Sequence, residues 1–156
     1  MPDLFLSVKL IHIMAMIVMV GATIINGVIH SHARASTPVE AAALLKVVTR
    51  INALFMGPSL LAIPASGILM MVLLGYDWRA GWLLSSITLT LALLVAFVVG
   101  DRVERDLHVI ASNASAAAQP SLPDLYQTTF AKAAPIGGAA LMMSLITLIL
   151  MIFKPF

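Results

Sequence analysis

Residues 10–33 read LIHIMAMIVMVGATIINGVIHSHA, a run without a single Asp, Glu, Lys or Arg. Three further runs share this property, at residues 51–76, 80–100 and 133–153. Each is long enough to cross a bilayer, because a hydrocarbon core of about 30 Å needs about 20 apolar residues of helix. The sequence therefore predicts an all-α fold, a four-helix transmembrane bundle, in which residues 1–156 form one integral membrane domain.

The composition limits what can surround this chain. It is 61% hydrophobic and 10% charged, whereas soluble domains contain about 25% charged residues. The lipid bilayer is therefore the expected environment. No nucleic acid partner is expected, because the net charge of +2 is small and the basic residues are not clustered. The absence of cysteine excludes iron–sulfur clusters, thiolate metal sites and cysteine nucleophiles.

The distribution of basic residues predicts the orientation in the membrane. Cytoplasmic loops carry an excess of Lys and Arg. The first and third loops with their flanks contain more of them than the opposite side does, and both chain termini are therefore expected to be external. The two sets are Arg34, Lys46, Arg50, Arg102, Arg105 and Lys132 against Lys9, Arg79 and Lys154.

Local signals predict that the second and third helices extend into the cytoplasm. Thr37-Pro38-Val39-Glu40 has the pattern of a capping box with proline at the first helical position, after a polar link at residues 30–36 that follows the first helix (residues 4–29). The third helix is expected over residues 82–118, about 55 Å at 1.5 Å per residue. Residues 75–82 should form a tight external turn, and residues 119–124 should separate the third helix from the fourth.

Most polar side chains of the first helix lie on one face. At 100° per residue, they fall within about 60° of His12. Because polar groups in lipid are costly, we expect this stripe to face the interior of the bundle. Its members are Lys9, His12, Met16, Met19, Thr23, Asn26 and His30.

His12 is the one candidate for a cofactor or metal ligand. It lies roughly two turns into a span, where an imidazole suggests a haem b or copper site, although it can equally serve as a polar contact between helices. His30 lies about 27 Å away along the helix axis. His12 and His30 therefore cannot bind the same haem iron. A haem at His12 would take a methionine as second ligand or keep an open position. Copper is supported by the spacing His12-x-Met14-x-Met16, but Met14 points away from His12.

The remaining polar clusters have simpler interpretations. His30-x-His32 is expected to begin a solvated loop. The acidic and basic residues from Asp101 to Asp106 are expected to form a solvated helix face. The sequence contains no phosphate-binding loop, no nucleophile–base pair and no paired intramembrane carboxylates, and this pattern is not that of a hydrolase, a nucleotide enzyme or a proton pump.

The order of several short motifs resembles a bacterial family of predicted integral membrane proteins, the domain-of-unknown-function family 2269. The motifs are Lys9-Leu10-Ile11-His12-Ile13, Ser66-Gly67, Gly75-Tyr76, Trp82-Leu83, Pro123, Tyr126, Pro135 and Phe153-Lys154-Pro155. The resemblance covers nearly the whole chain and implies four spans in the bacterial inner membrane, without an established reaction.

The first helix is also loosely similar to copper-resistance D domains and to J-type protoporphyrinogen oxidases. In those oxidases a histidine in this region is linked to haem b. This chain has Met19-Val20-Gly21-Ala22 where the oxidases carry a Trp-rich, arginine-bearing segment.

Three functions are therefore expected to compete. The first is a haem-b-binding or redox-associated membrane module with His12 as ligand. The second is a cofactor-free accessory or structural subunit of a larger membrane complex. The third is a small transporter that uses the polar stripe of the first helix. The expected partners are the lipid bilayer and either further copies of this chain in a homo-oligomer or a larger membrane complex.

Overall fold

The structure is a computed structural model that describes residues 2–155. It is 89% helical, and these residues form no strand. The helices are α1 (Pro2–Ala35), α2 (Pro38–Ile51), the π-helix η1 (Asn52–Met56), α3 (Gly57–Leu74), α4 (Gly81–Ala116) and α5 (Asp124–Phe153). Since α2, η1 and α3 follow one another without a break, the described chain has four helices that are long and apolar enough to cross a membrane. The predicted four-helix bundle is confirmed.

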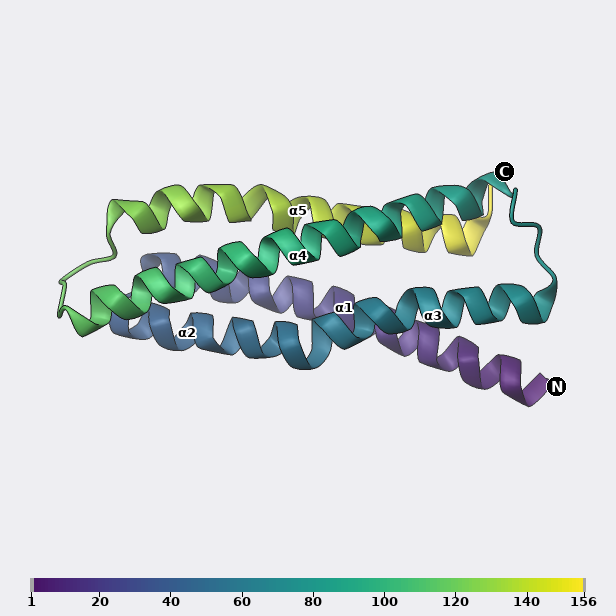
Figure 1. The fold of residues 1–156 in the computed structure, drawn as a ribbon, viewed down its shortest axis with the longest axis horizontal. Helices are drawn as coiled ribbons and strands as arrows, with labels where there is room; N and C mark the ends of the chain where they lie inside the picture. The colour runs from purple at the N-terminus through teal and green to yellow at the C-terminus, as the bar shows by residue number, and fades with distance from the viewer. Residues whose placement is uncertain (1, 156) are drawn as a thin grey trace.

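The helices lie side by side along one long axis (Figure 1), and the two ends of the chain lie at the same end of the bundle. We call this the terminal end, and the opposite end, with the α1–α2 and α4–α5 connections, the distal end. Helix α1 packs mainly on α3 and α2, while α4 packs on α5 and α2. The Lys and Arg bias makes the distal end the predicted cytoplasmic end.

The distal end is held together by a hydrophobic cluster that excludes solvent. Its six members are all 0% exposed and come from α1, α2, α4 and α5: Ala33, Ala41, Leu45, Leu107, Ala111 and Tyr126. This packing explains why α4 continues without interruption to Ala116, as predicted from its sequence. Residues 30–35, in contrast, were predicted as a polar link but continue α1, because Ala33 belongs to this buried cluster.

The predicted capping box starts α2. The side chain of Thr37 accepts a hydrogen bond from the Glu40 amide, and the Glu40 carboxylate accepts one from the Thr37 amide at 3.1 Å. Two amide donors that the helix itself cannot satisfy are thereby paired. The reversal of the chain between α1 and α2 is fixed at this point.

Aromatic residues hold the terminal end together. Gly75 ends α3 with a φ of 64°, a left-handed conformation that glycine adopts without steric cost. Tyr76 then packs edge-on against Trp82, with ring centroids 5.7 Å apart. The Lys154 amine, at the end of α5, lies 4.4 Å from the centre of the Tyr76 ring and donates a hydrogen bond to its hydroxyl. The predicted external turn is therefore joined to the last turn of α5.

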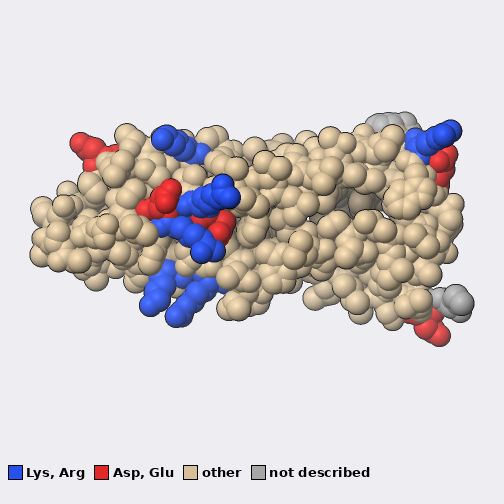
Figure 2. All heavy atoms as spheres, viewed as in Figure 1, with Lys and Arg blue, Asp and Glu red and all other residues tan. Residues whose placement is uncertain are grey.

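The charged side chains are segregated along the long axis. Figure 2 shows them gathered in the distal half of the visible face and at the ends of the molecule, with an uncharged zone over most of the terminal half. Apolar side chains such as Leu61, Leu91 and Ile149 are more than half exposed. This surface is the one that lipid covers.

Candidate functional site

His12 lies between α1 and α3 and is 7% exposed. Its Nδ1 atom is 3.0 Å from the carbonyl oxygen of Ile63 and 2.9 Å from the hydroxyl of Ser66. Gly67 also faces the ring, and a Cβ atom there would lie 3.5 Å from His12 Cε1, an ordinary van der Waals distance. The ring thus joins α1 to α3 through its hydrogen-bonding contacts.

The predicted inward face of α1 is correct for most of its members. His12, Met19, Asn26 and His30 are buried. Lys9 is exposed, and its predicted inward orientation is wrong. Near the terminal end of α1 a lysine can extend its long side chain toward the polar interface.

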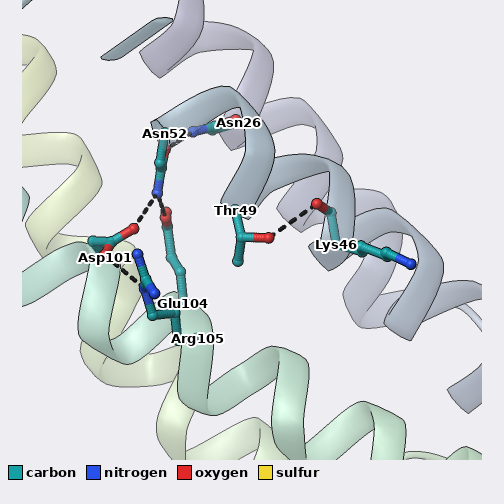
Figure 3. A network of polar contacts seen from close by, with 7 residues as sticks. All are labelled: Asn26, Lys46, Thr49, Asn52, Asp101, Glu104 and Arg105. Atoms are coloured by element: carbon teal, nitrogen blue, oxygen red, sulfur yellow. Dashed lines mark hydrogen bonds and ion pairs between the residues drawn. The ribbon is translucent and has the colours of Figure 1, made fainter. Parts of the chain in front are cut away.

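A network of polar side chains connects α1, η1 and α4 around Asn52 (Figure 3). The Asn52 side-chain amide donates to Asp101 Oδ1 at 3.2 Å and to Glu104 Oε2, and its Oδ1 accepts from Asn26 Nδ2 at 2.8 Å. We call the following group the Asn52 network: Asn26, His30, Asn52, Asp101, Glu104 and Arg105.

The two carboxylates complete the network in opposite directions. Glu104 Oε1 accepts from His30 Nε2 at 3.0 Å, toward the bundle interior. Asp101 Oδ2 accepts from Arg105 Nε at 2.8 Å, and the Arg105 side chain is 63% exposed. Each carboxylate therefore has one partner in the Asn52 amide and a second partner on the opposite side.

The π-helix places Asn52 at the start of an irregular turn. The Gly57 amide donates to the Asn52 carbonyl oxygen, a bond that spans one residue more than in an α-helix. Pro58, which follows, has no amide hydrogen to donate to the carbonyl of the preceding turn. Single π turns of this kind occur frequently at functional sites.

The network corrects the prediction for residues 101–106. These residues were expected to be a solvated face, and Arg102, Arg105 and Asp106 are indeed exposed. The side chains of Asp101 and Glu104, however, are only 16% and 18% exposed. Their spacing of three residues places them on one face of α4, and that face turns toward Asn52.

Two asparagines in the sequence indicated this site, but the charges around Asp101 indicated a solvated helix face instead. Asn26 and Asn52 are both asparagines within long apolar runs, where a polar group requires a partner. The i,i+4 pairing of Asp101 with Arg105 favoured a surface interpretation instead. His30, expected at the start of a solvated loop, is 8% exposed and belongs to the network.

A cavity of about 500 Å³, which we call the central cavity, adjoins the Asn52 network. Its polar lining includes Asn26, His30, Asn52, Asp101 and Glu104, and its apolar lining includes Met19, Met56, Leu60, Leu93, Phe97 and Phe130. Helix α5 contributes small residues, and a Cβ atom built on Gly137 or Gly138 meets no atom within 4 Å. Both glycines are exposed, so the cavity is open on the side of α5.

The acidic and imidazole side chains of the described residues do not form a preorganised metal site. Among residues 2–155, no group of three or more His, Asp or Glu side chains is arranged to hold a metal ion. His12 does not line the central cavity, and its Nδ1 atom is occupied by the contacts to α3. What the arrangement offers is a space with apolar walls and one acidic, hydrogen-bonding end.

Comparison with known proteins agrees with the membrane architecture. No curated protein and no solved structure gave a significant match. The family of predicted integral membrane proteins DUF2269 matches residues 6–155, which is nearly the whole chain and includes every residue of the Asn52 network and His12. The chain belongs to the DUF2269 family of predicted integral membrane proteins.

Proposed function

We propose that this protein is a small ligand-binding module of the bacterial inner membrane that acts as a transporter or receptor for a small solute. The observation that carries the proposal is the cavity of about 500 Å³ that adjoins two poorly exposed carboxylates, a histidine and two asparagines. Binding pockets in proteins combine mostly apolar walls with a few convergent polar groups. The central cavity has this composition.

The placement of the charges supports a role beyond helix packing. Asp101 directly follows the charge-free run at residues 80–100, so Asp101 and Glu104 lie at the boundary between the charged part of α4 and its uncharged part. Ionisable groups facing the interior of a membrane bundle are costly, and they typically mark paths for substrates or ions. Apolar residues would hold α1 and α4 together without the desolvation cost of buried charges, if the contact were purely structural.

If the cavity binds a small solute, a water-soluble reagent should reach its lining. The chain has no cysteine, so Gly138→Cys introduces a single thiol in the cavity lining. We expect it to react with N-ethylmaleimide in membrane vesicles at least about tenfold faster than a lipid-embedded thiol, because only a hydrated thiol ionises readily.

Gly21→Cys is the matched control for this experiment. Gly21 also lies in open space but does not line the central cavity. Equal and negligible labelling at both positions would contradict a solute-accessible cavity and the proposed function with it.

The binding of haem b at His12 is a second candidate, and one contact supports it. Histidines that ligate metals generally hold their other ring nitrogen against a carbonyl or carboxylate, and His12 Nδ1 is held by Ile63. Purified protein supplied with haem is then expected to show a Soret band that His12→Ala removes. An unchanged spectrum in the variant would rule out His12 as the ligand, and colourless wild-type protein would favour a cofactor-free accessory subunit.

A further inference from the structure

We infer that the ligand of the central cavity is an organic cation, a protonated amine with an apolar body, whose nitrogen binds at the Asn52 network. The inference rests on the proposed function, because it names the ligand class of the same cavity. Two observations support it independently of the acidic residues. They are two buried acceptor atoms without partners and the apolar character of the remaining walls.

The first observation concerns atoms that lack hydrogen bonds. Within the described chain, Asn26 Oδ1 and His30 Nδ1 are buried and have no partner, although both residues line the cavity and are only 4% and 8% exposed. An unpaired buried polar atom costs about 1–3 kcal/mol. A ligand that pairs with both atoms would recover this cost.

The hydrogen bonds of the network leave both atoms available as acceptors when the His30 ring is neutral. Asn26 donates through Nδ2 to Asn52, which leaves its carbonyl oxygen unpaired. His30 donates through Nε2 to the Glu104 carboxylate, and in the neutral ring the other nitrogen is then an acceptor. The two residues are one helical turn apart, where side chains face the same side at Cβ distances of about 5–6 Å. One nitrogen with several N–H groups can bridge them.

The charge of the site favours a cation. Two carboxylates face one guanidinium, and that guanidinium is mostly in solvent. Asn52 uses both amide hydrogens on the carboxylates, so it offers none to an anion. An anionic ligand would meet like charges and acceptor atoms, whereas an ammonium group would meet opposite charges and acceptors.

The apolar walls define the rest of the ligand. Met19, Met56, Leu60 and Phe97 line the cavity beyond the network, and methionines adapt to irregular shapes. A bare metal ion would leave this space empty, and no three acidic or imidazole side chains in residues 2–155 are arranged to hold one. An amine with an aromatic or aliphatic body occupies both parts of the site.

The test compares three ligands of nearly equal size: 2-phenylethylammonium, 2-phenylethanol and phenylacetate. Each is titrated by calorimetry into the protein in nanodiscs, with protein-free nanodiscs as the blank. We expect the ammonium ligand to bind at least about tenfold more tightly than the alcohol and phenylacetate not to bind, because a hydrogen bond to a charged group contributes enough for a tenfold to hundredfold preference.

Two carboxylate variants test the location of the site. Glu104→Gln is expected to reduce the preference for the ammonium over the alcohol to less than about threefold. Asp106→Asn makes the same chemical change on the exposed face of α4 and should leave the preference intact. As a second readout that does not depend on these variants, the ammonium ligand should slow maleimide labelling of Gly138→Cys.

The outcomes separate the inference from the proposed function. Equal binding of the alcohol or tighter binding of phenylacetate, with protection of the thiol, would overturn the cation assignment and leave a ligand-binding cavity. A thiol that reacts while none of the three ligands binds or protects it would also overturn the cation assignment and leave the solute-accessible cavity. A thiol that does not react at all would overturn the proposed function itself.

Discussion

Replacing Asn52 by leucine is expected to lower the free energy of unfolding by about 3–5 kcal/mol. Asn52 donates to the carboxylates of Asp101 and Glu104 and accepts from Asn26. Hydrogen bonds to charged groups contribute about 1.5–3 kcal/mol each, and the substitution leaves two poorly exposed carboxylates without their shared donor. Titration with denaturing detergent in mixed micelles measures the loss.

Thr49→Val is the matched control for this variant. Thr49 lies one turn earlier and donates only to the Lys46 carbonyl oxygen of its own helix (Figure 3). Its replacement should change the unfolding free energy by less than about 0.5 kcal/mol. If the loss in Asn52→Leu comes from the unpaired carboxylates, adding Glu104→Gln should recover part of it, with a coupling of about 0.5–3 kcal/mol. A full-size loss that Glu104→Gln leaves unchanged would contradict this explanation.

Replacing Leu107 by alanine is expected to cost about 2–5 kcal/mol, the range of large-to-small substitutions in well-packed cores. Leu107 is 0% exposed and packs with Leu45, Ala111 and Tyr126 in the distal cluster. The side chains of Ala33 and Ala41 in the same cluster are too short to fill the space that the substitution leaves. Thermal unfolding of the purified protein measures the effect.

Val109→Ala provides the comparison on the same helix. Val109 is 53% exposed and lies on the outer face of α4, so its truncation should change stability by less than about 0.5 kcal/mol. Similar losses in both variants would show that the distal extension is not a packed core.

The interior role of His12 could be predicted, but its partners could not. The periodicity of residues 12–30 gave one polar face, and a polar face in lipid must turn inward. Which helix meets that face depends on the pairing of α1 with α3. That pairing brings Ser66, Gly67 and the Ile63 carbonyl to the ring, across more than fifty residues of chain.

Local sequence patterns predict the candidate site less well than they predict the interior position of His12. Asp101 and Glu104 have ordinary surface-type spacing to Arg105 and His108, and nothing within α4 indicates that one side of this segment is covered. The decisive contact is with Asn52 of η1. Likewise, the small residues Ala134, Gly138 and Ala140 of α5 line a cavity, although small residues in membrane helices often permit close helix contact. Small residues allow either outcome, and the positions of the neighbouring helices decide between them.

The sequence by itself determined the four helices long enough to span a membrane, the capping box at Thr37 and the unbroken length of α4 to Ala116. These features depend on hydrophobic length, on hydrogen bonds within four residues and on helix propensity, which are local properties. Only the tertiary structure decided that Asn26, Asn52 and Glu104 meet, that Lys9 turns outward and that a cavity remains beside α5. These features depend on how helices distant in sequence pack against one another, because the energy of a buried polar group is set by the partner that packing supplies.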